Sequence, residues 1–323
     1  MSAAVGSVAV AVASWNGRRH LETLLPALEA QDDPGVPWEV LLFDNGSRDG
    51  TAAWVRRAFP RVRLVESPVN QGFCAANNRL VEASGADAVA LLNNDTRPRR
   101  DWLAALVGAL AAAPAEVAAV SGMIVDWEGE RLDFARGAMT FDGHAFQVGF
   151  RRPLAGPGAA EVPADGAELP FPCGGNLLVR RGSFLAAGGF DEDRYPHPSI
   201  EDIDLGHRLT ARGALVLLDP AIQGTHLKAW TLRSMLWTDF ARRGVPWVAL
   251  QLRDRRLSTA LNCGWRHRLS AASCAFRSLM SFMYATQYAI SPSLSWIGTS
   301  SNSRKYSMPF FLYALASPSN GER

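Results

Sequence analysis

The first 125 residues alternate between short apolar runs and longer amphipathic segments. In residues 18–30, Leu21, Leu24, Leu25 and Leu28 recur at the spacing of one helix face. Short, continuously apolar strands between such helices are typical of a parallel sheet that is covered on both faces. The predicted strands are residues 8–13, 40–43, 62–65, 89–92 and 117–125. The predicted helices are residues 18–30, 51–58, 73–83 and 102–110.

Polar residues follow each of the first four predicted strands. They are Ser14 and Asn16, then Asp44, then Asn70, and finally Asn93, Asn94 and Asp95. In open parallel sheets, ligands bind beyond the carboxyl ends of the strands, so this edge is the expected site. Turns also favour Asn, Asp and Gly, so each cluster taken alone is equally well explained as a turn.

The pattern changes after residue 125. Residues 126–150 alternate apolar and polar positions with glycines, which predicts hairpins, and residues 151–172 are rich in Pro, Gly and Ala, which predicts a loop or flap. A strand is expected at 175–180, a helix at 203–211 and a strand at 214–218, followed by a helical region after residue 228.

Charge is unevenly distributed along the 323 residues. The total of 33 basic and 31 acidic residues argues against nucleic-acid binding. Residues 1–227 hold 20 basic and 28 acidic side chains, whereas residues 228–323 hold 13 and 3. A basic end on an acidic body indicates that this end meets something anionic. Four widely spaced cysteines without a C-x-x-C motif, and an N-terminus without a basic leader region, favour a cytoplasmic protein.

Residues 278–303, between Arg277 and Arg304, contain no charged side chain and would be long enough to cross a bilayer, which takes roughly 20 residues. Serines and other polar residues interrupt this stretch, so a buried or interfacial segment is favoured over a membrane span. Several enzyme classes lack their motifs in this chain. There is no G-x-G-x-x-G, no G-x-x-x-x-G-K-[ST] and no G-x-S-x-G.

Two clusters carry candidate chemistry. Asp95 and the amide oxygen of Asn93 are hard oxygen donors that suit Mg²⁺ or Mn²⁺ carrying a diphosphate, and His226 could add an imidazole. Glu201 and Asp202 open a predicted helix, where a carboxylate could act as a general base towards an acceptor hydroxyl. Each has a structural alternative, namely a turn, a surface histidine, and acidic residues that complement a helix dipole.

Taken together, these clusters resemble an inverting glycosyltransferase of family 2 with the GT-A fold. The matching segments are Ser14-Trp15-Asn16, Asp44-Asn45-Gly46-Ser47, Asn70-Gln71-Gly72-Phe73, Asn93-Asn94-Asp95, Cys173-Gly174-Gly175-Asn176, Gly188-Gly189-Phe190-Asp191, Glu201-Asp202-Ile203-Asp204 and Gly224-Thr225-His226. Each segment alone is weak evidence, but their shared order and spacing over residues 8–226 is specific.

The resemblance implies a role for each site residue. Ser14, Asn16, Asp44 and Asn70 would hold the nucleotide, together with Asn93, Asn94 and Asp95 towards its diphosphate. Asp95 and His226 would be the ligands of Mn²⁺ or Mg²⁺, and Asp202 would be the catalytic base. Gly175, Asn176 and Glu201 would lie on the side of the acceptor or the donor sugar. The chain departs from the family's D-x-D motif because Asn93 replaces the first Asp, which leaves one carboxylate instead of two.

The expected architecture is an α/β GT-A fold with a Rossmann-like, mostly parallel sheet. Residues 1–125 would form the nucleotide-sugar-binding half, residues 126–228 the acceptor-binding and catalytic half, and residues 229–323 a basic, mostly helical region. This interpretation requires Asp44, Asp95, Asp202 and His226 to converge on one pyrophosphate-sized hollow.

The Asn-Asn-Asp motif and the Trp15-Asn16-Gly17 start resemble most closely the bacterial rhamnosyltransferase-like subgroup, which implies dTDP-L-rhamnose or a UDP- or GDP-sugar as donor. The Q-x-x-R-W motif of processive members is missing, which favours transfer of one sugar. The acceptor would be a glycan or a polyprenyl-linked saccharide. The basic, tryptophan-containing tail suits contact with the anionic inner face of the cell membrane, and a homodimer interface or an ordinary solvated surface explains it equally well.

Two alternative functions remain at this level. Asn93 makes a nucleotide-sugar-binding protein without activity conceivable. A sugar-1-phosphate nucleotidyltransferase would share a related sheet but needs a glycine-rich basic loop after the first strand, and residues 14–18 are too short and too poor in glycine for that.

Overall fold

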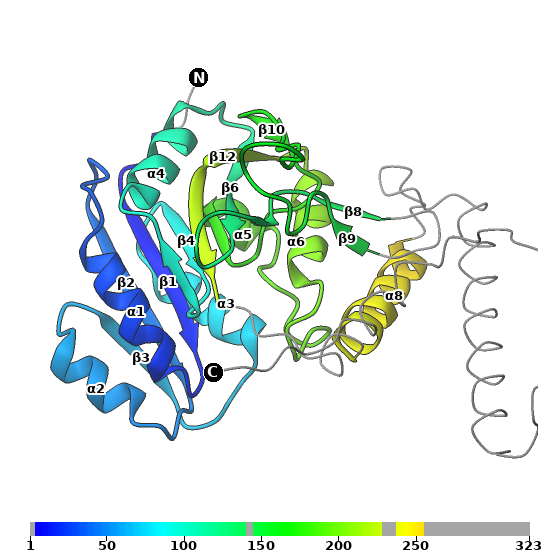
Figure 1. Ribbon diagram of the computed structural model, residues 1–323. Helices are drawn as coiled ribbons and strands as arrows, with labels where there is room; N and C mark the ends of the chain where they lie inside the picture. The colour runs from blue at the N-terminus through cyan, green and yellow to red at the C-terminus, as the bar shows by residue number, and fades with distance from the viewer. Residues whose placement is uncertain (1–3, 140–144, 228–236, 255–323) are drawn as a thin grey trace, which may run out of the picture. The chain divides into compact units, whose positions relative to one another are not determined.

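The structure is a computed structural model that describes residues 4–139, 145–227 and 237–254 (Figure 1). The chain divides into two compact units, Met1–Ala272 and Ser273–Arg323. The second unit lies outside the described residues, so the fold below is that of the first.

One mixed sheet and the helices on its two faces make up the described fold. Its strands are β1 (Val8–Ser14), β2 (Trp38–Asn45), β3 (Arg63–Ser67), β4 (Ala88–Leu92), β5 (Thr96–Pro98), β6 (Val117–Val125), β7 (Leu132–Phe134), β10 (Ala167–Glu168), β11 (Asn176–Arg180) and β12 (Leu215–His226). A separate antiparallel pair consists of β8 (Gly137–Met139) and β9 (Ala145–Gln147). The helical elements are α1 (Arg18–Glu29), α2 (Thr51–Ala58), α3 (Phe73–Ala83), α4 (Trp102–Ala112), α5 (Arg181–Ala186), α6 (Glu201–Thr210), η1 (Thr238–Gly244) and α8 (Val245–Asp254).

The strand order is β10-β12-β6-β11-β4-β1-β2-β3, with β5 paired to β12 and β7 to β6. The pairs among β1, β2, β3 and β4 are parallel, as the apolar runs predict. β11 instead runs antiparallel to both of its neighbours, β4 and β6. The α/β prediction is therefore confirmed, whereas the sheet is mixed and not mostly parallel, because β11 enters from the edge at which β4 and β6 end.

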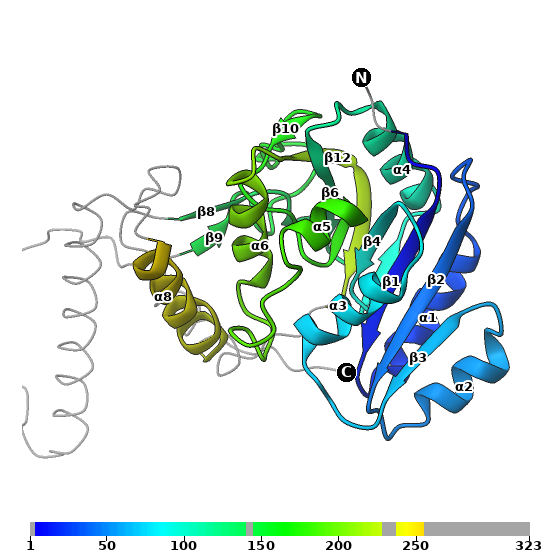
Figure 2. The same ribbon diagram turned by 180° about the vertical axis from the view of Figure 1, so that it is seen from behind.

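The two faces of the sheet bury different helices. Val8, Val10 and Val12 of β1 pack into the cluster that includes the buried residues of α1, α2 and α4. Ala9 and Ala11 point the other way, into the cluster that includes α3, α5, α6 and α8. Figures 1 and 2 show these helices on both sides of the sheet. The alternation along β1 therefore builds two cores from one strand.

One edge of the sheet collects the ends of β1, β2, β4, β6 and β12. β11 begins at this edge, since Asn176 lies opposite Leu92, the last residue of β4. α6 also begins near this edge, because Asp202 in its first turn contacts the loop before β11. Side chains that are remote in the sequence are thus brought to one edge, in the order β2, β1, β4, β11, β6, β12.

Three strands differ from the predictions, and one of them, β10, lies in the predicted loop 151–172. β12 is a single strand of 12 residues that begins at Leu215, within the predicted strand 214–218, and continues to His226, with a register shift between Asp219 and Gln223. β5 was not predicted, because three residues that include an Arg and a Pro carry no strand signal. In the part of the chain that the structure describes, no helix has the length and apolarity needed to cross a bilayer. The charge-free stretch 278–303 and most of the basic tail lie outside the described residues.

Candidate functional site

The loops after β1 and β2 are joined by side-chain hydrogen bonds. The Asn16 side-chain oxygen accepts a bond from the Arg48 N–H at 2.8 Å, and the Asn16 N–H donates to Ser47 Oγ at 2.8 Å. Asn16 has a φ of 49°, a left-handed conformation that Asn tolerates better than most residues. Ser14 and Asp44 are buried neighbours on the paired strands. Three predicted nucleotide residues therefore lie side by side.

Asn70 joins this group through Asn45, a residue that the sequence analysis did not single out. Asn45 Nδ2 donates to Asn70 Oδ1 at 3.0 Å, and Asn45 Oδ1 accepts from the Gln71 N–H at 2.7 Å. Gly46 has a φ of 77°, and a Cβ at this position would lie 2.7 Å from the Val69 carbonyl carbon. Asn45-Gly46 was part of the matching segment 44–47 but was given no role of its own, so its function of joining the loops after β2 and β3 was missed.

The segment after β4 connects this group to His226. Asn94 Nδ2 donates to Ser14 Oγ at 3.0 Å, which joins the ends of β1 and β4. Asp95 Oδ1 lies 2.8 Å from His226 Nε2. The pairing of β5 with β12 explains this contact, because it places Thr96 directly opposite His226. The predicted proximity of Asp95 and His226 is thus present, through a strand that was not predicted.

The donor atoms at this corner fit a hard divalent cation in part. A carboxylate oxygen and an imidazole nitrogen converge within 2.8 Å, so both could contact one ion. Among residues 4–139, 145–227 and 237–254, no group of three or more His, Cys, Asp or Glu side chains is arranged to hold a metal. Mg²⁺ is commonly held by one or two carboxylates plus substrate phosphates and water, so two protein ligands suit an ion that arrives with a diphosphate.

Asp202 meets the end of β4 through a pair of glycines. Its Oδ2 accepts from the Gly174 N–H at 3.3 Å, and its Oδ1 accepts from the Ile203 N–H at 2.9 Å. The next residue, Gly175, passes so close to Asn93 that a Cβ there would lie 2.4 Å from Asn93 Nδ2. One dipeptide therefore contacts both Asp202 and the Asn93 side chain, which brings the predicted base to the predicted diphosphate corner.

The two carboxyl groups at the start of α6 have raised pKa values. Burial is the largest cause for Asp202, and it is opposed by the N–H groups of Gly174 and Ile203 and by the charge of Arg243. Burial, followed by the negative charge of Asp202, raises the pKa of Glu201 to about 7. Ionising both groups together is unfavourable, and such neighbours titrate as a pair. A carboxyl group whose pKa is raised is better suited to accept a proton than an ordinary surface aspartate.

Asn176 has a different environment from the other predicted residues. It is fully buried, its Oδ1 accepts from Trp102 Nε1 at 2.7 Å, and its Nδ2 donates to the Met123 carbonyl at 3.1 Å. These contacts lie within the core between β11, β6 and α4. Asn176 therefore supports the site from within the core and does not reach its surface. The preceding Gly175, in contrast, contacts Asn93.

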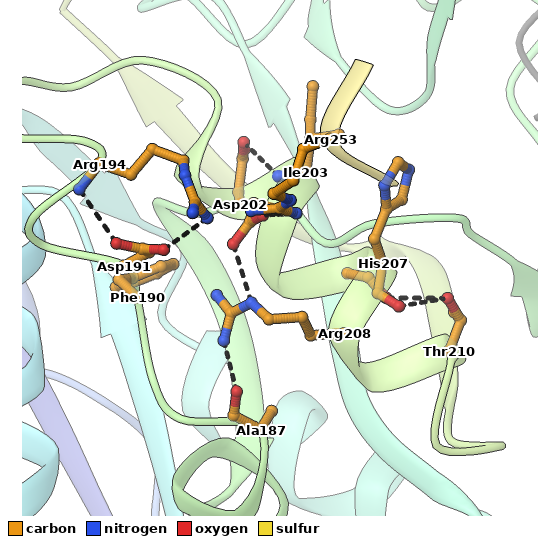
Figure 3. A network of polar contacts seen from close by, with 12 residues as sticks. Ala187, Phe190, Asp191, Arg194, Asp202, Ile203, His207, Arg208, Thr210 and Arg253 are labelled. Carbon is orange, nitrogen blue, oxygen red and sulfur yellow. Dashed lines mark hydrogen bonds and ion pairs between the residues drawn. The ribbon is translucent and has the colours of Figure 1, made fainter. Parts of the chain in front are cut away.

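A cluster of ion pairs joins α6 to α8, and Figure 3 labels its two arginines, Arg208 and Arg253. Asp204 is fully buried, and its two oxygens accept from Arg208 Nε and Arg253 Nη2, each at 2.8 Å. Arg208 belongs to α6 itself, whereas Arg253 comes from α8. This cluster was not found from the sequence, because Asp204 was interpreted only as part of an acidic helix start.

Further contacts join the C-terminal helical segment to α6. Ser199 Oγ, just before α6, donates to the Arg242 carbonyl of η1. The Trp247 ring of α8 is largely buried and lies 6.2 Å from the His207 ring of α6. Residues beyond the sheet thus help to fix the helix that carries Asp202.

Comparisons with known proteins agree with this arrangement. Residues 9–186, more than half of the chain, match the model of the family described as Glycosyl transferase family 2. An N-acetylglucosaminyl-diphospho-decaprenol L-rhamnosyltransferase of Mycobacterium tuberculosis is 31% identical over 242 residues, which are 68% of this chain and 76% of that protein. Glycosyltransferase AglE of Haloferax volcanii is 29% identical over 42% of each chain.

Solved structures show the same fold. The mannosyltransferase PcManGT of Pyrobaculum calidifontis, in complex with GDP-Man and Mn²⁺, superposes with a TM-score of 0.59 at 20% identity, over 89% of this chain and 81% of that one. GalNAc-T7 with UDP, GalNAc and Mn²⁺ gives a TM-score of 0.56 at 15% identity, over 71% of this chain and 45% of that one. The fold is therefore GT-A, as predicted. The chain belongs to glycosyltransferase family 2 and is of the rhamnosyltransferase-like type.

Proposed function

We propose that this glycosyltransferase moves one sugar from a nucleoside-diphosphate donor to an acceptor hydroxyl with inversion at the anomeric carbon, using Asp202 as the base. The name of the mycobacterial relative supports L-rhamnose as the sugar, from a dTDP-L-rhamnose-like donor, and a polyprenyl-diphosphate-linked N-acetylglucosamine as the acceptor. UDP- and GDP-sugars remain the alternative donors.

The contact through Gly174 and Gly175 carries this proposal. It sets Asp202 beside Asn93, two residues before Asp95, at the edge where Ser14 and Asp44 also lie. A nucleotide bound by the loops after β1 and β2 would direct its diphosphate towards Asn93, Asn94 and Asp95. Its anomeric carbon would then face the side of the site that holds Asp202.

The reaction is a single displacement. The acceptor oxygen attacks the anomeric carbon from the face opposite the diphosphate, and Asp202 takes the proton of the acceptor hydroxyl. The new carbon–oxygen bond forms as the bond to the diphosphate oxygen breaks, and the nucleoside diphosphate leaves with that electron pair. The attack from the opposite face explains inversion, and the raised pKa of Asp202 increases its affinity for the proton.

Asp95 and His226 are the residues that would hold Mn²⁺ or Mg²⁺. A bound divalent cation would compensate the negative charge that develops on the leaving diphosphate. Asn93 supplies no charge of its own, so Asp95 is the one carboxylate of the Asn-Asn-Asp segment. Thermal shifts with dTDP, UDP and GDP, each with and without Mn²⁺, will show base preference and metal need together. A stabilisation by dTDP that Mn²⁺ does not increase would contradict the metal assignment.

The transfer assay that tests the proposal combines dTDP-L-rhamnose, or a UDP- or GDP-sugar, with an N-acetylglucosaminyl diphosphate that carries a short prenyl chain. We expect release of the nucleoside diphosphate and a disaccharide product whose anomeric configuration, read by NMR, is inverted relative to the donor. A retained configuration would exclude the single displacement. Donor binding by calorimetry without donor consumption would instead favour the inactive nucleotide-sugar-binding protein that Asn93 suggests.

A further inference from the structure

A cavity lies next to His226, on the side of its imidazole that faces Asp133. This cavity has a volume of about 190 Å³, and its lining includes Asp126, Trp127, Asp133, Phe150, Arg151 and His226. The imidazole of His226 separates it from the diphosphate corner. His226 Nε2 lies 2.8 Å from Asp95 Oδ1, and His226 Nδ1 lies 3.8 Å from Asp133 Oδ2. An occupant of the cavity would therefore be one imidazole ring away from Asp95.

The strand order places this cavity at the ends of β6 and β12. The nucleotide loops follow β2 and β1, Asp95 follows β4, and the glycines that contact Asp202 precede β11. The cavity comes next, because Asp126 and Trp127 follow β6 and His226 ends β12. Asp95 itself lies beside His226, because β5 pairs with β12. The cavity therefore adjoins the diphosphate corner, and the ends of β11 and β6 separate it from the nucleotide loops.

The inner surface of the cavity suits one sugar ring. Trp127 and Phe150 offer aromatic faces, and Phe150 is 48% exposed. Asp126 and Asp133 are largely buried carboxylates. Asp126 is held in place, since its Oδ1 accepts from the N–H groups of Glu130 and Arg131. Aromatic faces pack against the apolar side of a sugar, and carboxylates accept hydrogen bonds from its hydroxyls. The volume is below the roughly 300–1,000 Å³ of sites for drug-sized ligands, which limits the occupant to a single ring.

Two guanidinium groups lie over the aromatic residues of the cavity. The Arg97 guanidinium carbon is 4.2 Å from the centre of the Trp127 ring, and Arg97 Nη2 donates to the Trp127 carbonyl at 2.8 Å. Arg151 lies over Phe150 at 6.0 Å and 3.7 Å from Asp126. Both arginines are exposed and keep donors for an anion, because a guanidinium has five N–H groups. A neutral sugar needs no such pair, whereas a glycosyl diphosphate would place its phosphates beside them.

We infer that this cavity is the acceptor subsite and that it binds a glycosyl diphosphate. The sugar ring stacks against the Trp127 face opposite the Arg97 guanidinium and its hydroxyls bond to Asp126 and Asp133, while Arg97 and Arg151 bind the phosphates. This inference rests on the proposed function, because it identifies the substrate that Asp202 deprotonates. The donor sugar is the competing occupant, and its own diphosphate is already accounted for at Asp95.

The test measures binding and turnover with two probes on the full chain. One is N-acetylglucosaminyl diphosphate with a short prenyl chain, and the other is octyl N-acetylglucosaminide, which has no phosphate. Loss of the stacked ring in Trp127→Ala should raise the Kd and KM of both probes by about 3- to 10-fold, and Trp127→Phe should recover part of this. Arg97→Ala should raise the Kd and KM roughly tenfold for the diphosphate probe alone, and Arg97→Lys should recover part of the lost affinity.

The matched control is Trp237→Ala, which removes a tryptophan that is 62% exposed at the start of the C-terminal helical segment. It should leave the Kd and KM of both probes unchanged. The Kd of dTDP should not change in any variant. Unchanged acceptor affinity in Trp127→Ala overturns the inference and leaves the proposed function intact. A rise in the KM of the donor sugar instead of the acceptor identifies the cavity as a donor site and also overturns it. Binding of both probes without any transfer by the wild type would contradict the proposed function but not the subsite.

Discussion

The two sides of the site are built in different ways. On the nucleotide side, loops that follow the neighbouring strands β1, β2 and β3 hold one another through mostly uncharged hydrogen bonds, such as those of the Asn16 side chain with the Arg48 N–H and of the Asn45 side chain with the Gln71 N–H. On the side of the base, α6 is fixed by the loop before β11 and by η1 and α8. Buried charges dominate on this side, because Glu201 and Asp204 are both buried in the first turn of α6.

This difference separates the expected effects of substitutions. The nucleotide side depends on backbone conformation, so changes there should affect donor binding and leave the chemical step alone. The side of the base depends on buried charges, so changes there should affect the rate, the stability or their pH dependence.

Replacing Asp202 with Asn should lower kcat by on the order of 10²-fold or more, because the amide keeps the size of the side chain but cannot take the acceptor proton. Donor affinity, measured by calorimetry with dTDP, should stay near the wild-type value. The matched control is Asp165→Asn, which neutralises an exposed aspartate in the loop before β10. Near-normal turnover of Asp202→Asn would remove Asp202 from the role of base.

Neutralising Asp204 should cause the largest loss of stability. Asp204→Asn leaves Arg208 and Arg253 without their shared carboxylate, and breaking a buried pair costs about 3 to 5 kcal/mol. Arg253→Gln should cost about 1 kcal/mol or less, since the Arg253 side chain is 33% exposed and water can replace part of the contact. Urea unfolding measures both variants. Equal losses would show that α8, and not the burial of Asp204, governs the stability of this cluster.

The same contrast explains what the sequence could predict. Ser14, Asp44 and Asp95 were identified because each follows a continuous apolar strand, and parallel strands place such residues at one edge. The approach of His226 to Asp95 depends on β5, whose three residues have no strand pattern and are stabilised by pairing with β12. Tertiary contact decides such short strands, so local sequence could not reveal this one.

The buried charges on the side of the base were also beyond the sequence. Asp204 and Arg253 are 49 residues apart, and nothing local distinguishes Asp204 from the helix-start carboxylates around it. Asn176 was expected at the sugar but bonds to Trp102 in the core, because a buried strand needs a partner for that indole N–H. In each case a long-range contact selects among several roles that the residue type permits.

The raised pKa of Glu201 predicts a pH dependence of stability. Its value of about 7 lies above the ordinary 4.5, so the folded state resists ionisation of this group. The free energy of unfolding should therefore fall as the pH rises from about 4.5 to 7 and level off above 7. The fall should be on the order of 3 kcal/mol at most, because one pKa unit corresponds to about 1.4 kcal/mol and the shift is shared with Asp202.

Glu201→Gln should remove most of this fall, since the amide can still accept the bond from the Ser199 N–H but does not ionise. Urea unfolding at pH 5, 6, 7 and 8 measures it, with Glu116→Gln on an exposed loop as the control. If the free energy of unfolding of the wild type rises between pH 5 and 7, the prediction is wrong, because ionising a buried, uncompensated carboxyl group must lower stability.

The smallest predicted effect tests the nucleotide side alone. Gly46 and Gly35 have nearly equal φ angles of 77° and 74°, so an alanine at either is strained by about 1 to 2 kcal/mol. They differ in their surroundings, because a Cβ on Gly46 would lie 2.7 Å from the Val69 carbonyl carbon, whereas a Cβ on Gly35 would meet nothing within 4 Å. Gly46→Ala should therefore displace the loops that hold Asp44 and Asn70.

Gly35→Ala introduces a similar backbone strain but displaces no loop. It therefore controls for a loss of stability while the loop contacts stay intact. The Kd of dTDP should rise several-fold in Gly46→Ala and stay unchanged in Gly35→Ala, while kcat at saturating donor stays near the wild-type value in both. A loss of kcat in Gly46→Ala at saturating donor would mean that the nucleotide loops also determine the position of the reacting groups. The two sides of the site would then be coupled, although no charged contact joins those loops to Asp202 among the contacts described above.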